Sequence, residues 1–156
     1  MIPSRMDRLW ADYGEHHQQP GNKYCHMIGI PLIIVGLLGL LSVPLFRVGT
    51  LVVDWALIYI VVIGAVDLFL DAKLSAAMFL VNLVLWLVAG KLGWHSALGL
   101  FVLGWILQLV GHGACEKRSA AFYKNLAHLV VGPLWVLNHF VHLRSEPNAS
   151  PAPVGS

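Results

Sequence analysis

Five long apolar stretches dominate this chain, and short polar connections separate them. The stretches cover residues 27–46, 50–70, 74–92, 96–114 and 126–143. Runs of about 20 apolar residues are long enough to cross a hydrocarbon core about 30 Å thick as α-helices. The connections between the first four stretches are short, so neighbouring helices should form antiparallel hairpins. The pattern predicts an all-α fold: a polytopic membrane helical bundle of about five transmembrane helices.

The fifth stretch fits a full span least well, because Asn138, His139 and His142 crowd its end. Polar and ionisable side chains are costly within the hydrocarbon region. A shallow or re-entrant helix is therefore the alternative for this stretch.

The segment before the first stretch predicts a different kind of helix, over residues 5–18. Its apolar residues recur at helical spacing, with charged residues between them: Met6, Leu9, Trp10 and Tyr13. This pattern is typical of an amphipathic helix that lies at the membrane interface. Pro20 and Gly21 should end this helix, and Asn22 is the predicted N-cap of the next one.

Composition supports a membrane protein with a single domain. The 156 residues are 58% hydrophobic and only 12% charged, with a mean hydropathy of +0.73, whereas soluble domains have about 25% charged residues. No linker divides the chain, so residues 1–145 are predicted to form one membrane-embedded catalytic domain. Residues 146–156, rich in Pro, Ala and Ser, are a predicted disordered tail. A net charge of +2 gives no reason to expect a nucleic-acid partner.

The positive residues are unevenly divided between the two predicted sides of the membrane. Seven lie on the side of the N-terminus: Arg5, Arg8, Lys23, Lys73, Lys117, Arg118 and Lys124. Three lie on the other side: Arg47, Lys91 and Arg144. Cytoplasmic loops carry the excess of Lys and Arg, so the N-terminus is predicted to be cytoplasmic.

Two polar clusters fall on that same predicted face. The first is Tyr13, His16, His17, Asn22 and His26, and the second is Gln108, His112, Glu116, Lys117 and Arg118. His112 and Glu116 are four residues apart and share one side of a helix, with Gln108 one turn earlier. His17 and His26 would point apart on one continuous helix, but the Pro20-Gly21 break allows both rings to converge.

Imidazole and carboxylate ligands together suit Fe, Zn or Mn, and two histidines with one carboxylate suit non-haem Fe(II) and O₂. The simpler alternative is that these residues only anchor helix ends at the interface. Asp67 and Asp71 could accept hydrogen bonds from ligand histidines, or could cap the membrane boundary and pair with Lys73. His128 is a further candidate ligand. Cys25 and Cys115 belong to no CxxC pair, so we expect packing residues rather than a disulfide.

Both clusters resemble the signatures of a known family, the membrane 2-hydroxy-fatty-acid dioxygenases, which are linked to phytosphingosine breakdown. The first signature is Tyr13-x3-His17-x2-Pro20-x-Asn22-x3-His26-x2-Gly29-x-Pro31, and the second is Gln108-x2-Gly111-His112-x3-Glu116-Lys117-Arg118. The similarity covers roughly residues 8–140. The chain departs from the family pattern at Ala120, where a proline is usual; Ala121 follows as expected.

The resemblance implies an Fe(II)-dependent dioxygenase that uses O₂ to shorten 2-hydroxy long-chain fatty acids by one carbon. The implied metal ligands and catalytic residues are His17, His26 and His112, with Glu116 as a fourth ligand or a partner of the ligands. The residues assigned to substrate are Tyr13, Asn22, Gln108, Lys117 and Arg118, the last two suiting a carboxylate. The substrate would be the free acid or its CoA ester, with its acyl chain among the helices. The main rival is a non-enzymatic membrane carrier or scaffold. A desaturase-type enzyme is disfavoured because the eight histidines are not arranged in HxxxH and HxxHH boxes.

Overall fold

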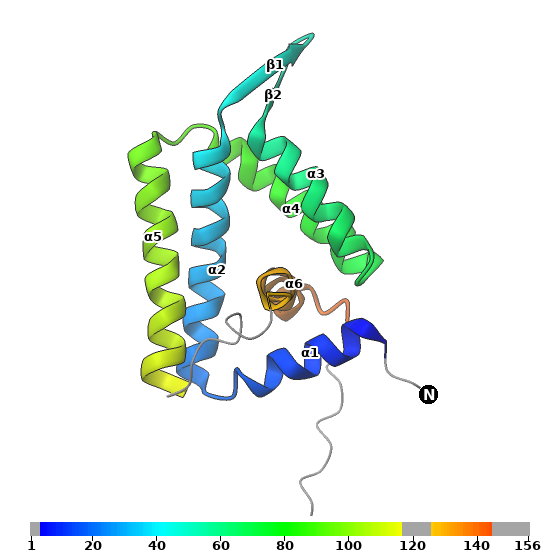
Figure 1. The fold of residues 1–156 in the computed structure, drawn as a ribbon, viewed down its shortest axis with the longest axis vertical. Coiled ribbons are helices and arrows are strands. Elements are labelled where there is room, and N and C mark those ends of the chain that lie inside the picture. Colours follow the sequence, from blue (N-terminus) through cyan, green and yellow to red (C-terminus); the bar gives the residue numbers. More distant parts are fainter. Residues whose placement is uncertain (1–3, 117–125, 145–156) are drawn as a thin grey trace, which may run out of the picture.

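The computed structural model describes residues 4–116 and 126–144, and its architecture is shown in Figure 1. In this part of the chain the elements are mostly helices, with one β-hairpin. In chain order they are α1 (Arg5–Glu15), α2 (Pro20–Leu41), β1 (Pro44–Val48), β2 (Leu51–Asp54), α3 (Trp55–Leu68), α4 (Ala72–Ala89), α5 (Trp94–Val110), the π-helical turn η1 (Gly111–Glu116) and α6 (His128–Val141).

Two helix pairs form the framework of the molecule. Helices α2 and α5 lie side by side, and α3 and α4 form a second pair inclined to the first (Figure 1). Helix α6 lies between the pairs at the end away from the hairpin, and α1 closes that end. The buried core includes Leu38 of α2, Ile60 of α3, Leu74 of α4 and Leu134 of α6.

The close approach of α2 and α5 depends on glycine. A Cβ atom at Gly36 would lie 2.5 Å from the backbone nitrogen of Phe101 and 2.7 Å from the carbonyl oxygen of Ala97. A Cβ atom at Gly104 would lie 2.7 Å from the carbonyl oxygen of Gly29. Small residues let helix backbones pack closely in membrane proteins, where helix association depends on van der Waals contact. The α2–α5 pair therefore has little room for any side chain at these positions.

Three helical segments are long and apolar enough to cross a membrane: Pro20–Leu41, Ala72–Ala89 and Trp94–Glu116. Helices α3 and α6 have 14 residues each, which gives a length of about 21 Å at 1.5 Å per residue. A hydrocarbon core about 30 Å thick exceeds that length. The apolar helices indicate a membrane protein, with three candidate spans among the described residues in place of the predicted five.

Helix α6 crosses α1, and side-chain contacts near both ends of α6 reach that helix (Figure 1). His128 Nε2 lies 2.7 Å from Asp12 Oδ2 at one end. At the other end Arg144 forms ion pairs with Asp7 and, at 2.7 Å, with Asp71. In Figure 1 α6 is seen end-on and α2 and α5 are seen from the side, so α6 crosses their direction. The shallow-helix alternative for this stretch agrees with that direction and stays a prediction.

The side of the membrane predicted for Arg144 is therefore wrong. Its guanidinium pairs with Asp7, which lies between Arg5 and Arg8, and with Asp71, which is close to Lys73. The charge count placed these positive neighbours on the side of the N-terminus. Moving Arg144 changes the distribution of positive residues from seven against three to eight against two. The corrected count strengthens the same orientation, which stays a prediction.

Helix α1 begins at a capping box, in which Ser4 and Asp7 each bond the backbone of the other. Its apolar residues Met6, Trp10 and Tyr13 are at most 2% exposed. The apolar stripe that predicted contact with the membrane surface is therefore buried inside the protein, and α1 contacts α6. A location of α1 at the membrane interface stays a prediction.

The predicted break between the first two helices is confirmed, but its cap is different. Helix α1 ends at Glu15 and α2 begins at Pro20, with Gln19 as the N-cap residue. Proline is favoured in the first turn because its missing N–H has no helical partner there. The prediction of Asn22 as the N-cap is wrong, since this residue lies inside the first turn of α2.

A β-hairpin lies between α2 and α3, where the apolar pattern predicted the end of the first membrane helix and the start of the second. Strands β1 and β2 pair antiparallel around Gly49, whose φ of +62° suits a residue without a side chain. Pro44 and the β-branched Val48 and Val52 favour strand over helix. Apolar content alone does not distinguish a buried helix from a strand, which explains why an all-α fold was predicted.

A candidate metal centre

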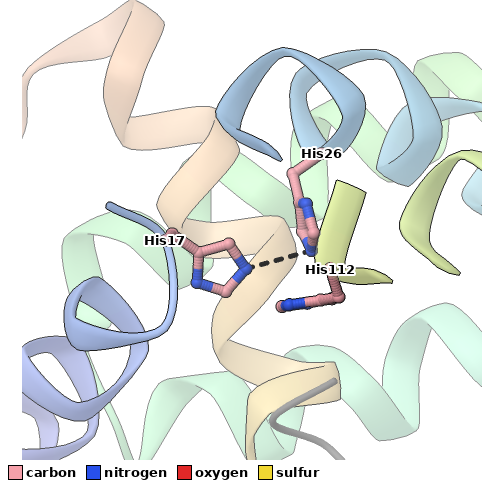
Figure 2. A group of neighbouring side chains, drawn as sticks. All are labelled: His17, His26 and His112. Carbon is pink, nitrogen blue, oxygen red and sulfur yellow. Dashed lines mark hydrogen bonds between the residues drawn. The ribbon is translucent and has the colours of Figure 1, made fainter. Parts of the chain in front are cut away.

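Three histidines from separate segments meet in the interior: His17, which follows α1, His26 of α2 and His112 of η1. They are 2%, 4% and 4% exposed. One nitrogen from each ring lies within 4.8 Å of the other two, and Figure 2 shows the three rings turned toward a common point. The structure thus brings together the three histidines predicted as metal ligands, and they can hold a metal ion.

Backbone carbonyls fix the orientation of two of these rings. His17 Nδ1 lies 2.6 Å from the carbonyl oxygen of Tyr13, and His26 Nδ1 lies 3.0 Å from that of Asn22. A carbonyl only accepts, so both Nδ1 atoms carry the hydrogen and both Nε2 atoms carry a lone pair in the neutral rings. Hydrogen bonds of this kind commonly fix the tautomer of metal-binding histidines.

The donor set fits a cation. The Nε2 atoms of His17 and His26 are 3.0 Å apart, and two lone pairs at that distance repel unless a positive charge lies between them. His112 Nδ1 is buried and has no hydrogen-bond partner within the described part of the chain. A metal ion bound by the three rings would satisfy all of these nitrogens, and imidazole suits Fe, Zn, Cu and Ni.

Burial also keeps the His17 imidazole neutral, which is the form that binds a metal. Removal from water, together with the nearby His26, lowers the pKa of His17 to about 2. Metal binding requires a neutral imidazole, and His17 stays neutral through mildly acidic pH. Tyr13 stacks on His17 with ring centroids 3.9 Å apart, and burial raises the pKa of its phenol.

The π-helical turn η1 positions His112 against α2. Such turns occur frequently at functional sites. A Cβ atom at Gly111 would lie 2.5 Å from Asn22 Oδ1 and 2.9 Å from the Cβ of Cys25. The absence of a side chain at Gly111 therefore allows η1 to approach α2, and brings His112 to His26.

The group of ligand nitrogens does not include Glu116, which the resemblance gave as a fourth ligand or as a partner of the ligands. Its Oε1 accepts from the backbone N–H of Gln19 at 2.7 Å and from Asn22 Nδ2 at 3.4 Å. A carboxylate at this place accepts hydrogen bonds from the free N–H groups at the start of α2. Its negative charge also interacts favourably with the positive end of the dipole of that helix. Asn22 is fully buried and does not line the cavity described below, so the structure gives it a positioning role rather than the predicted substrate contact.

This arrangement predicts an intermediate effect of substitution at Glu116. We expect Glu116→Ala to lower the metal affinity of the site by about 10- to 100-fold, the range for residues that orient ligands. Glu116→Gln keeps an oxygen that can accept from Gln19 and should lose less. Competition with a chelator measures both affinities. Equal and complete loss of iron in both variants would show that Glu116 is itself a ligand.

The three histidines form one wall of a cavity of about 270 Å³. Its other walls are largely apolar and come from α2, α3, α5 and α6: Ile30, Ile33, Ile34, Leu37, Tyr59, Phe101, Trp105, Leu129, Gly132 and Pro133. From His26 to Leu37 the lining follows α2 for about 16 Å, at 1.5 Å per residue. Tyr13 and Gln108, both predicted to bind substrate, also line the cavity.

The other candidates have different places. Asp71 caps α4 through the N–H groups of Lys73 and Leu74, and its charge pairs with Arg144 rather than with the Lys73 side chain. Asp67 is buried, and neither aspartate has a hydrogen bond to the three histidines. Lys117 and Arg118 lie outside the described residues. Cys25 and Cys115 are free thiols.

One feature of the site was missed from sequence. His128, considered from sequence as a further ligand, lies 2.7 Å through Nε2 from Asp12 Oδ2 and is one of the residues that line the cavity. The two residues lie on α1 and α6, which meet only in the folded protein. Spacing along the chain gives no signal for such a pair.

The fold and site define a helical protein with candidate membrane spans and a buried three-histidine centre beside an apolar cavity. The chain belongs to the Mpo1-like family: the model described as "2-hydroxy-palmitic acid dioxygenase Mpo1-like" matches residues 4–143. It is similar to the 2-hydroxy-palmitic acid dioxygenase MPO1 of Saccharomyces cerevisiae, with 32% identity over 133 residues, covering 83% of this chain and 75% of the yeast protein. No solved structure matches the chain significantly.

Proposed function

We propose that this protein is an Fe(II)-dependent dioxygenase that converts 2-hydroxy long-chain fatty acids to the acid one carbon shorter. The observation that carries the proposal is the three-histidine centre set in the wall of an apolar cavity. The name of the yeast relative, a 2-hydroxy-palmitic acid dioxygenase, supports the same substrate class. For 2-hydroxypalmitate the reaction balances with one O₂, giving pentadecanoate, carbon dioxide and water.

The cavity suits the two unlike parts of such a substrate. Its apolar walls along α2 and α5 favour the acyl chain, because each buried methylene contributes about 0.8 kcal/mol. Its polar wall holds His17, His26 and His112, together with Tyr13 and Gln108. A chain that enters along the helices therefore places its carboxyl end at the histidines.

The residues of the chain prepare the reaction in specific ways. An iron ion held by His17, His26 and His112 would supply the redox chemistry with O₂. His17 and His26 present their Nε2 atoms because Tyr13 and Asn22 hold the opposite sides of the rings. The apolar walls restrict water at the reacting end. Lys117 and Arg118 stay candidates for binding the carboxylate, and the cytoplasmic location of the site stays part of the proposal.

The direct test is conversion by purified protein. Anaerobically purified, Fe(II)-loaded protein in detergent should convert 2-hydroxypalmitate to pentadecanoate when air is admitted, with release of the carboxyl carbon. Mass spectrometry of the fatty acids measures the product, and carboxyl-labelled substrate measures the released carbon. Exclusion of O₂ or addition of a chelator should stop the reaction.

Palmitate is the matched control substrate, and we expect it to be turned over poorly because it lacks the hydroxyl group. Equal turnover of both acids would contradict a role for the hydroxyl. Absence of turnover for both acids and for the CoA ester, in protein that holds no stoichiometric iron, would favour the carrier or scaffold alternative.

A further inference from the structure

We propose that His128, held by Asp12, is the specificity-determining residue that recognises the 2-hydroxyl group of the substrate. The inference rests on the proposed function, since it assigns one atom of the cavity to one group of a 2-hydroxy acid. It assigns His128 a role in substrate selection in place of the metal-ligand role considered for it from sequence.

The ring of His128 is fixed in one orientation. It is 5% exposed, and its Nε2 donates to the Asp12 carboxylate across 2.7 Å. An ionised carboxylate only accepts, so Nε2 carries the hydrogen and Nδ1 is the accepting nitrogen of the neutral ring. Asp12 thus prepares His128 Nδ1 to accept a hydrogen bond.

That accepting nitrogen has no partner within the described part of the chain, although its residue lies at the cavity. His128 lines the cavity, and its Nδ1 is buried without a hydrogen-bond partner among residues 4–116 and 126–144. An unpaired polar atom in the interior is costly, and native proteins normally pair it. The cavity is where a pairing group can be supplied.

His128 also lies close to the metal centre. The Tyr13 ring stacks on His17 at 3.9 Å and contacts His128 edge-on at 5.6 Å between centroids. One aromatic ring therefore separates His128 from a metal ligand. A substrate whose carboxyl end lies at the three histidines places its second carbon within the same part of the cavity.

The unpartnered polar atoms match the head group of a 2-hydroxy acid. Besides His128 Nδ1, the described part of the cavity lining has three buried, unpartnered atoms: the amide nitrogen of Gln108, the hydroxyl of Tyr13 and His112 Nδ1, which faces the metal centre. The amide donates and the phenol can donate, which suits carboxylate oxygens. With His112 assigned to the metal, His128 Nδ1 is the remaining imidazole nitrogen of the described lining that needs a donor, and the 2-hydroxyl is the one donor that an ionised 2-hydroxy acid offers.

Palmitate has a carboxylate and an acyl chain but no hydroxyl, so it leaves His128 Nδ1 unpaired. A site built to pair a substrate hydroxyl rejects the analogue that lacks it, because a buried polar group then loses its partner. His128 therefore lowers affinity for palmitate rather than adding affinity for fatty acids in general. The expected signature is a change in selectivity.

The test measures binding without turnover. Anaerobic Fe(II)-loaded protein is titrated with radiolabelled 2-hydroxypalmitate, and unlabelled palmitate competes for the site. His128→Phe keeps an aromatic ring but removes both nitrogens, and it should lower the preference for the hydroxy acid by about 10- to 100-fold. His128→Asn keeps a polar atom near the Nδ1 position and should restore part of the preference. Iron content should be unchanged in both variants.

His139 supplies the matched control, because it is an exposed histidine on the same helix. His139→Phe should leave selectivity unaltered. An equal loss of affinity for both acids in His128→Phe would overturn the inference and assign His128 to the carboxylate. Loss of iron would instead make it a ligand, and unchanged selectivity would also overturn the inference. Failure of the wild-type protein to convert 2-hydroxypalmitate tests the proposed function separately.

Discussion

Alanine in place of His17, His26 or His112 is expected to remove stoichiometric Fe(II) and abolish conversion of 2-hydroxypalmitate. Each ring supplies one of three nitrogens that face a common point. Loss of a residue that merely orients a ligand lowers metal affinity by about 10- to 100-fold, so loss of a ligand itself should exceed that range. Metal analysis after gel filtration measures the iron, and product formation in air measures activity.

The matched control is His95→Ala, at the opposite end of α5 from η1. His95 is exposed and stacks on the neighbouring Trp94, so its removal should leave one equivalent of iron. Each ligand variant should still elute as a folded, detergent-solubilised protein. Full iron content and activity in any of the three variants would remove that residue from the metal centre.

Alanine in place of Gly36 is expected to destabilise the protein by about 3 kcal/mol or more, at the upper end of overpacking effects. The new Cβ atom would lie 2.5 Å from the Phe101 backbone nitrogen, and backbone atoms cannot rotate away. Helices α2 and α5 must separate, which also displaces His112 from His26. Unfolding in detergent measures the stability, and iron content should fall in parallel.

Gly99→Ala distinguishes this clash from the general effect of adding a methyl group. Gly99 lies on α5, and a Cβ atom there meets nothing within 4 Å. Alanine is favoured over glycine within helices by up to about 1 kcal/mol, so this variant should be as stable as the parent or more stable. Equal destabilisation by both substitutions would show that the α2–α5 contact is not close-packed.

The sequence predicted the site better than it predicted the fold's details. Two signatures placed His17, His26 and His112 at one end of the helices, because the Pro20-Gly21 break allowed the first two rings to converge. The role of Glu116 was not predictable. A carboxylate one turn from a histidine suits either a ligand or a helix cap, and only the position of Gln19 decides between them.

The fold's details depended on contacts between distant segments. Apolar content predicted membrane spans, yet it could not show that the last apolar stretch crosses α1 and the direction of α2 and α5. That arrangement depends on Asp7 and Asp12, which contact Arg144 and His128. Pro44 and Gly49 were local signals for the hairpin. Because the strands and the adjoining helices are both apolar, hydrophobicity does not show where a helix ends and a strand begins.

The three histidines of the centre are synthesised at different times during translation. His17 and His26 are made early, whereas His112 follows α5, and translation of the chain between His26 and His112 takes on the order of ten seconds. The two early rings offer a cation only two nitrogens. The complete donor set exists only after α5 has been made and has packed along α2, so a metal held by all three rings would be acquired after that stage. Such an ion would tie the N-terminal segment to the end of α5.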